Sequence, residues 1–179
     1  MKKRVLVIST SLRGGSNSEQ LAEAFAAGAR EAGHEVEFVS LKQKKLQFCI
    51  GCLSCLETGH CVLKDDAAEL VEKMRRAEVI AFATPIYYYE MSGQMKVLLD
   101  RSNPLFESEY AFRDIYLLTV AAENEAETPE GAEHGLKGWI ACFEKARLAG
   151  SLFSGGNDGP NTIKGKESLA AAHALGKKV

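Results

Sequence analysis

Residues 4–21 read RVLVISTSLRGGSNSEQL, a short apolar run, a loop dense in hydroxyl groups, and the start of a helical pattern. The apolar run Arg4–Ser9 is rich in valine and isoleucine, which predicts a buried strand of a parallel sheet. From Leu21 to Ala32 apolar residues recur at intervals of three and four, and Gly33 supplies the stop expected of an amphipathic helix. This stretch therefore predicts one strand–loop–helix unit of an α/β fold.

The same alternation continues along the chain. Further strands are expected at residues 36–41, 79–83, 115–120 and around 152–153, and further helices at about 67–76, 92–101, 136–148 and 166–175. Five such pairs in 179 residues predict a single domain over residues 1–179, with one three-layer, doubly wound, five-stranded parallel sheet. We expect the flavodoxin-like strand order 2-1-3-4-5. Ligands of such sheets bind beyond the carboxyl ends of the strands, so the loops after strands 1, 3 and 4 are the places to examine.

The loop after the first strand has the composition of an anion site. It lacks both G-x-G-x-x-G and G-x4-G-K-[ST], which disfavours a dinucleotide turn and a triphosphate loop. Ser16 and Glu19 form the pattern of a capping box, free N–H groups at a helix start attract phosphate, and Arg13 is the one nearby cation. The residues alone leave two interpretations open, a monophosphate site and a serine-rich turn with a plain N-cap. The polar side chains concerned are Ser9, Thr10, Ser11, Ser16, Asn17 and Ser18.

The loop after the third strand is aromatic. Pro85 is expected to end the strand because it lacks an amide donor, and Ser92 or Gly93 to begin the next helix. Tyr87, Tyr88 and Tyr89 then lie beside the first loop, where aromatic faces could stack on a planar ring. The alternative is that the three tyrosines simply cap the end of the sheet.

Together these motifs resemble the NAD(P)H-dependent FMN reductase family of flavodoxin-like proteins, over residues 4–176. Members commonly have Gly-Ser-Pro-Arg and then Asn-Thr or Asn-Ser after the first strand, where this chain has TSLR at 10–13 and NS at 17–18. Asp-Asp, Pro-hydrophobic-Tyr, Lys and Asp-Arg follow in the family, and here they occur at 65–66, 85–87, 96 and 100–101. Thr10 and Leu12 depart from the commoner glycine and proline, so the turn is expected to differ in detail.

The resemblance implies a cofactor, a reaction and a partner class. NAD(P)H would reduce bound FMN, and electrons would pass on to a quinone, a flavin or another small acceptor; no side chain is assigned a catalytic role. A homodimer or larger homo-oligomer is also implied. The FMN phosphate would be bound by Ser11, Arg13, Ser16, Asn17 and Ser18, and the ring by Pro85, Ile86, Tyr87 and Tyr88. The loop at 121–134 carries five glutamates and is expected to be a solvated face.

Residues 49–61, CIGCLSCLETGHC, contain four of the five cysteines, Cys49, Cys52, Cys55 and Cys61. Closely spaced runs of this kind supply thiolates to [4Fe–4S] clusters, and the spacing is similar to that of iron-sulfur flavoproteins, a branch of the same superfamily. Zinc fits poorly because structural zinc sites usually pair two separate knuckles. We favour free thiols packing a tight loop over a cluster. Cys142 is expected to be a buried residue of a helix.

The whole chain limits the classes of function. Its net charge is −2, with 46% hydrophobic and 26% charged residues, which favours neither nucleic acid nor a membrane surface as a partner. The apolar run after MKKR is too short for a signal peptide, so we expect a cytoplasmic protein with reduced thiols. Two alternatives to an oxidoreductase stay open. One is an iron-sulfur flavoprotein acting in electron transfer, and the other is a flavodoxin-type carrier or sensor.

Overall fold

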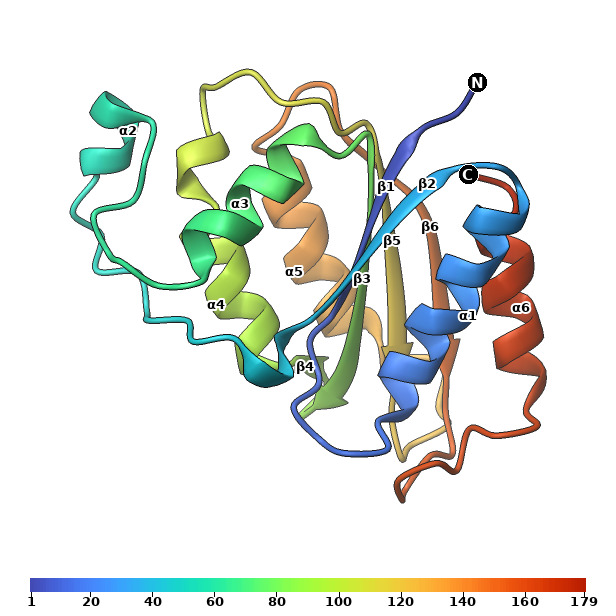
Figure 1. Ribbon diagram of the computed structural model, residues 1–179. Helices are drawn as coiled ribbons and strands as arrows, with labels where there is room; N and C mark the ends of the chain where they lie inside the picture. Colours follow the sequence, from blue (N-terminus) through green and yellow to red (C-terminus); the bar gives the residue numbers. More distant parts are fainter.

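The computed structural model describes residues 1–179 and shows a parallel sheet with helices on both faces (Figure 1). The strand order is β2-β1-β3-β5-β6, which confirms the predicted arrangement, and a short β4 pairs antiparallel with β3. The strands are β1 Arg4–Ser9, β2 Glu35–Ser40, β3 Val79–Tyr87, β4 Glu90–Met91, β5 Asp114–Val120 and β6 Arg147–Ser154. The helices flanking the sheet are α1 Asn17–Glu31, α3 Ala67–Arg76, α4 Gly93–Arg101, α5 Glu130–Ile140 and α6 Glu167–Gly176.

Each central strand contributes to two apolar cores, because successive side chains of a strand point to opposite faces. In β1, Leu6 and Ile8 belong to the core beneath α3, α4 and α5, whereas Val5 and Val7 belong to the core beneath α1 and α6. All four side chains are at most 2% exposed. This burial on both faces fixes the register of β1, and so fixes where its loop leaves the sheet.

Helices α1 and α6 lie in contact along one face, and two glycines permit their close approach. A Cβ atom at Gly28 would lie 2.0 Å from the carbonyl oxygen of His173, and one at Gly176 would lie 2.1 Å from that of Phe25. No larger residue fits at either position without moving a backbone. The contact holds α6, and therefore the segment that precedes it, against α1.

Strand β3 is longer than expected. Pro85 was expected to end it, and this is wrong: Pro85 is the register partner of Val120 in β5, and β3 continues to Tyr87. The extension forms a hairpin in which Ile86 pairs with Met91 of β4. The strand therefore carries its last residues beyond the sheet into the loop region.

The fifth helix lies earlier in the chain than expected. It spans Glu130–Ile140, so the second half of the acidic run is helical, and the expected helix 136–148 is wrong at both ends. Glu130 and Glu133 occupy its first turn, where negative charge is favoured by the helix dipole. Because the helix ends at Ile140, Cys142 falls in the following turn and is exposed, which corrects the expectation that it is buried.

The cysteine loop leaves the sheet after β2 and runs outside α3 and α4 (Figure 1). It begins with a short 3-10 helix, Leu41–Gln43, and contains one short helix, α2, at Ser54–Thr58. Several of its large apolar side chains are exposed, including Phe48 at 76% and Ile50 at 66%. The loop therefore does not owe its shape to a core of its own.

A buried ion pair fastens both ends of this loop to the end of α4. The guanidinium group of Arg101 donates to the two carboxylate oxygens of Asp65 at 2.6 and 2.9 Å, and to the carbonyl oxygen of Gln47 at 2.7 Å. The Asp65 carboxylate also accepts from the N–H groups of Gln47 and Ala67, at 2.7 and 3.0 Å. The two charged side chains are 0% and 3% exposed. Residues just before and just after the cysteines are thus held at one point.

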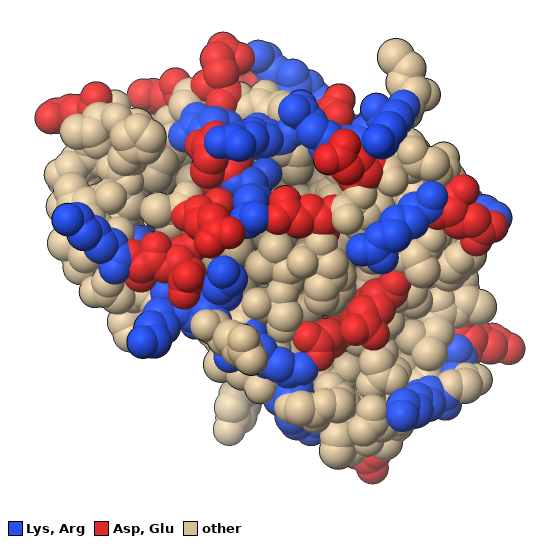
Figure 2. Space-filling model, in the orientation of Figure 1, with Lys and Arg blue, Asp and Glu red and all other residues tan.

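On the face shown in Figure 2, basic and acidic side chains are interspersed, and no large region of one sign is visible. Many of these charges are paired within the chain, as Lys73 is with Glu37 and Glu69. None of the helices combines the length and the apolar character needed to cross a membrane.

The ion pair gives a stability prediction. Asp65→Asn should lower the free energy of unfolding by about 3–5 kcal/mol, because Arg101 is left buried without its counter-charge. Burial raises the pKa of Asp65, but bonds from Arg101, Gln47 and Ala67 outweigh this, so the pKa lies below its usual range. A carboxyl of this kind stabilises the fold above its unfolded pKa of about 3.9 and loses that contribution as the pH falls through its folded value. The gap between wild type and variant should therefore narrow below about pH 4.

Urea unfolding at several pH values measures this gap. The matched control is Asp100→Asn, the next-to-last residue of α4, whose exposed pair with Lys96 is worth about 0.3–0.5 kcal/mol. Equal losses in the two variants would show that the buried pair has no special role.

Candidate cofactor sites

A pocket of about 220 Å³ lies where the loops after β1, β3 and β5 meet. All the residues predicted to bind FMN line it except Tyr88, and Arg13 is the one positively charged side chain among its lining residues. These lining residues are Ser11, Arg13, Ser16, Asn17, Ser18, Pro85, Ile86 and Tyr87. The pocket therefore lies at the carboxyl edge of the sheet, where ligands of doubly wound folds bind.

The start of α1 presents donors to this pocket. The Ser16 hydroxyl accepts from the N–H of Glu19 at 3.2 Å, which confirms the predicted N-cap, while the Glu19 carboxylate pairs with Lys42 rather than completing a capping box. The hydroxyls of Ser16 and Ser18 lie 3.0 Å apart. Each hydroxyl has a single proton, so one of the two protons is left for a ligand. The N–H groups of Asn17 and Ser18, in the first turn, add the donors typical of phosphate sites.

Thr10, which departs from the family pattern, does not line the pocket. Its side chain instead links the first loop to β3 and to the start of α4. Its hydroxyl donates to the carbonyl oxygen of Ala83 at 3.1 Å and lies 3.0 Å from the hydroxyl of Ser92. Ser92 in turn caps α4 by accepting from the N–H of Met95, and its own N–H donates to the Thr84 hydroxyl at 3.0 Å. The buried hydroxyls of Thr10, Thr84 and Ser92 thus connect the first loop, β3 and the start of α4.

The loop after β6 also borders the pocket, although the sequence did not lead us to expect it there. Asn157 and Asp158 of this loop line the pocket. The side chain of Asn17 binds the loop, donating to the carbonyl oxygen of Gly159 at 2.7 Å and accepting from the N–H of Ile163 at 3.3 Å. Its amide is therefore engaged within the protein, and its N–H is what remains for a ligand. The run GGNDGP at 155–160, directly after a strand, was the available signal of a further loop at this edge.

The tyrosines of the hairpin between β3 and β4 lie in two different environments. Tyr87 lines the pocket and is 53% exposed, whereas Tyr88 is fully exposed at the tip. Tyr88 and Tyr89 have φ of +51° and +62°, as in a two-residue turn that normally contains Asn-Gly. Bulky residues in this conformation store strain, and such strain is common at functional sites. The part of Tyr88 in ring binding stays a prediction.

The acidic loop is solvated, as expected. Glu123, Glu125 and Glu127 are exposed, and Glu133 of α5 pairs with Lys137 at 2.6 Å. The loop reaches the pocket through two small residues at its start, Ala121 and Ala122. The glutamates themselves are not among the lining residues.

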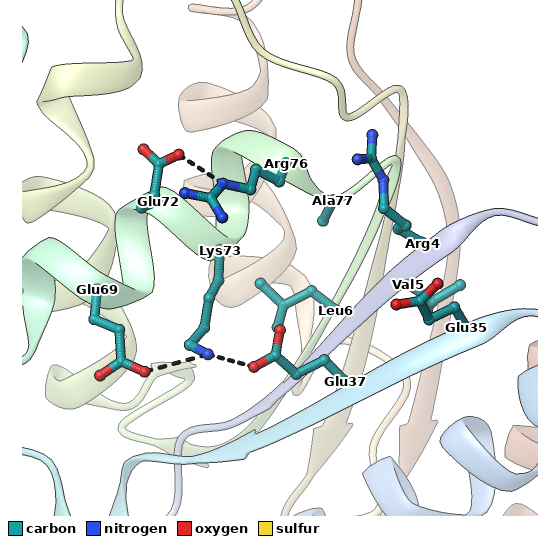
Figure 3. A pocket seen from close by; sticks show the side chains of 10 residues that line it. All are labelled: Arg4, Val5, Leu6, Glu35, Glu37, Glu69, Glu72, Lys73, Arg76 and Ala77. Atoms are coloured by element: carbon teal, nitrogen blue, oxygen red, sulfur yellow. Dashed lines mark hydrogen bonds and ion pairs between the residues drawn. The ribbon is translucent and has the colours of Figure 1, made fainter.

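A larger hollow of about 390 Å³ lies near the amino ends of β1 and β2, beside α3 (Figure 3). Lys73 lies there between Glu37 and Glu69, and its pKa is raised by its bonds to Glu37 first and Glu69 second. Arg76 likewise pairs with Glu72 at 2.8 Å. Because these charges satisfy one another at the opposite edge of the sheet, we do not assign this hollow a ligand.

All four clustered cysteines line one pocket of about 310 Å³ under the cysteine loop. No three His, Cys, Asp or Glu side chains are grouped so as to hold a single metal ion. A [4Fe–4S] cluster instead takes four cysteine thiolates, one bound to each of its irons, so its ligands do not converge on one ion. The donor set fits such a cluster. Cys49 and Cys52 are exposed and Cys55 and Cys61 are partly exposed. The choice between a cluster and free thiols packing a tight loop stays a prediction.

The thiols also have donors beside them. The pKa of Cys52 lies below its usual range because the N–H of Ser54, and then its hydroxyl, bond to the sulfur. The Cys55 sulfur accepts from the side-chain amide of Asn103 at 3.0 Å. Leu53 and Gly51 have φ of +59° and +66°, which turns the backbone sharply between the first cysteines. The loop thus places hydrogen-bond donors beside the sulfurs of Cys52 and Cys55.

Comparison with known proteins assigns the family. Residues 3–158 match the family of NADPH-dependent FMN reductases, which is well over half of the chain. The chain belongs to this family. A solved structure of an NAD(P)H:quinone oxidoreductase from Methanothermobacter marburgensis superposes with a TM-score of 0.75 at 19% identity, covering 99% of this chain and 96% of that one. At this identity the likeness shows the flavodoxin-like fold alone.

Two relatives known from sequence differ in kind. An iron-sulfur flavoprotein of Methanocaldococcus jannaschii is 41% identical over 102 residues, which is 57% of this chain and 53% of the relative. A Bacillus subtilis protein with the provisional name NAD(P)H-dependent FMN-containing oxidoreductase is 25% identical over 98% of this chain and 97% of its own length. The chain spans about half the length of three curated iron-sulfur flavoproteins, of which it covers 53%, 40% and 48%.

Proposed function

We propose that this protein is an FMN-dependent NAD(P)H oxidoreductase that passes electrons to a small acceptor such as a quinone or a flavin. The observation that carries the proposal is the meeting of the Ser11–Ser18 loop and the Pro85–Tyr87 segment in one pocket at the carboxyl edge of the sheet. Membership of the FMN reductase family and the full-length relative from Bacillus subtilis support it. When bound, FMN supplies the hydride and electron chemistry.

The residues of the pocket divide the work of binding. In this proposal Ser11, Ser16, Ser18 and the first N–H groups of α1 hold the phosphate, with Arg13 as its counter-charge. Pro85, Ile86 and Tyr87 bound the opposite side, where a flat ring would lie against apolar and aromatic surface. Asn17 positions the loop after β6, which closes the pocket from a third side.

We further propose that the cysteine loop holds a [4Fe–4S] cluster, so that the protein has two redox centres. The four thiols are solvent-accessible and line one pocket, which favours a cluster over thiols that merely fill space. The 41% identity to an iron-sulfur flavoprotein supports this. The cluster would give the protein a one-electron centre beside the flavin. The homo-oligomer implied by the resemblance stays a prediction.

Phosphate recognition predicts different responses of two flavins to the same substitution. Ser18→Ala removes a buried hydroxyl that is not the helix cap, so it should leave the fold unchanged. Hydrogen bonds to charged groups are worth about 1.5–3 kcal/mol, so FMN affinity should fall about tenfold or more while riboflavin affinity stays the same. Titration of the apoprotein with each flavin measures both. Equal losses for the two flavins would contradict a phosphate role.

Turnover distinguishes an enzyme from a carrier. FMN-loaded protein should oxidise NADH or NADPH in the steady state when a quinone or free flavin is present. The rate is followed at the nicotinamide absorbance. FMN binding without turnover, with either nucleotide and with several acceptors, would instead indicate a flavodoxin-type carrier or sensor.

Cluster binding predicts a fixed pattern among cysteine variants. Anaerobically prepared protein should contain about four irons and four sulfides per chain, and Cys49→Ser, Cys52→Ser, Cys55→Ser and Cys61→Ser should each lose most of the cluster while keeping FMN. Cys142→Ser, the matched control outside the loop, should change neither iron nor sulfide. Iron-free wild-type protein after anaerobic reconstitution would refute the cluster and leave the flavin proposal standing.

A further inference from the structure

The segment that ends α4 presents two donor side chains to the cysteine pocket. Arg101 is the last residue of α4, Asn103 begins the 3-10 helix Asn103–Leu105, and both line the pocket together with the four cysteines. The side-chain amide of Asn103 donates to the sulfur of Cys55 at 3.0 Å. The side-chain amide of Asn103 makes no other hydrogen bond within the chain.

Arg101 is close to a second sulfur and has one donor left. Its two terminal nitrogens bind Asp65 and the backbone carbonyls of Gln47 and Leu63, but its buried Nε–H has no partner within hydrogen-bond distance. Buried N–H groups without partners are rare and call for an explanation. Arg101 and Cys61 both line the cysteine pocket. The unused donor therefore lies in the neighbourhood of a candidate cluster ligand.

We propose that Asn103, which donates a hydrogen bond to the sulfur of Cys55, and Arg101, which lines the same pocket and has an unpartnered Nε–H, raise the reduction potential of the cluster. This inference rests on the proposed cluster. One-electron reduction adds one negative charge to the cluster and its four thiolates. N–H donors aimed at the sulfurs stabilise that added charge more than they stabilise the oxidised form, so they shift the equilibrium toward reduction.

The effect comes from directed donors rather than from net charge. Asp65 neutralises Arg101, and Asp100, which also lines the pocket, is paired with Lys96 on the outer side of α4. The charges around the pocket therefore largely cancel. What remains is the N–H donor of Asn103 on the Cys55 sulfur and the free Nε–H of Arg101 at the same pocket. Hydrogen bonds to metal ligands tune metal centres.

Asn103 is the cleaner position to test, because Arg101 also clamps the loop. Asn103→Leu removes the donor and keeps a side chain of similar size. The cluster should remain, with unchanged iron and sulfide content. Its midpoint potential should fall by up to about 59 mV, which for a one-electron couple is a tenfold change in the ratio of reduced to oxidised cluster. An anaerobic redox titration followed by electron paramagnetic resonance measures this, and the flavin potential serves as an internal reference that should not move.

Two further variants complete the test. Arg101→Lys keeps a positive charge opposite Asp65 but has no N–H at the Nε position, so the cluster potential should fall here too. Gln94→Leu, the matched control, removes a side-chain amide from the same helix at a residue that does not line the cysteine pocket, and should shift the potential far less than either.

The possible failures are distinguishable. If wild-type protein holds no iron and sulfide after anaerobic reconstitution, the cluster proposal fails and this inference fails with it. If wild-type protein holds the cluster, and the clusters of Asn103→Leu and Arg101→Lys have the wild-type midpoint potential, only this inference fails. If Asn103→Leu keeps FMN but cannot hold the cluster, the tuning role is also refuted, because Asn103 is then required for assembly.

Discussion

The buried ion pair between Asp65 and Arg101 joins the cysteine loop, which lies outside the sheet, to the end of α4, which packs on the sheet. Arg101 ends α4, and α4 begins at its cap Ser92, whose hydroxyl contacts those of Thr10 and Thr84. One helix of nine residues, about 13 Å long, thus runs from the hydroxyls that link the first loop to β3 to the wall of the cysteine pocket. This helix therefore helps to set the relative position of the two proposed redox centres.

The ion pair between Asp65 and Arg101 is needed because the cysteine loop has no apolar core of its own to stabilise it. Its apolar side chains are largely exposed, and burial of apolar surface is the main source of folding energy. Holding residues 47 and 65 at one point restricts the chain between them, so the four thiols remain near one another even before anything binds. A buried pair of charges is a costly way to do this, since both must lose water, but it is also selective: neither partner is tolerated alone. The loop is thereby fixed in one place.

The fold was largely predictable because its signals are local. Runs of apolar residues in strands, and the period of α1, are visible within short windows, and the order of the sheet follows from the α/β alternation. The wrong element boundaries depend on interactions with residues outside the short stretch of sequence from which each element was predicted. Pro85 stays in β3 because β4 folds back on the strand. Helix α5 starts at Glu130 because negative charge is favoured at a helix amino end, and the acidic run gave no sign of where that end lies.

The candidate sites show the same contrast between local features, which the sequence reveals, and contacts between distant residues, which it does not. The hydroxyls of Ser16 and Ser18 could be found from the sequence because they lie in one turn with the helix start. The pairing of Asp65 with Arg101 could not, although both residues stand out in the family pattern, because 36 residues separate them. The clamp by Asn17 on the loop after β6 spans a still greater separation. Conversely, the cysteine spacing was visible at once, but whether the thiols face a common pocket depends on the clamp and on Leu53 and Gly51 in the turn.

The two pockets use donors of different origin, and this has a consequence for how each can change. Phosphate binding would rely on N–H groups and hydroxyls at the start of α1, which the sheet holds rigidly, so it should tolerate little variation in Ser16 or in its neighbours. The cysteine pocket takes its donors from side chains at the end of α4, outside the sheet. Asn103 lines neither the proposed flavin pocket nor either apolar core. The properties of a cluster can therefore be adjusted at Asn103 independently of the flavin, whereas a change at Ser92, where α4 meets the first loop, reaches both.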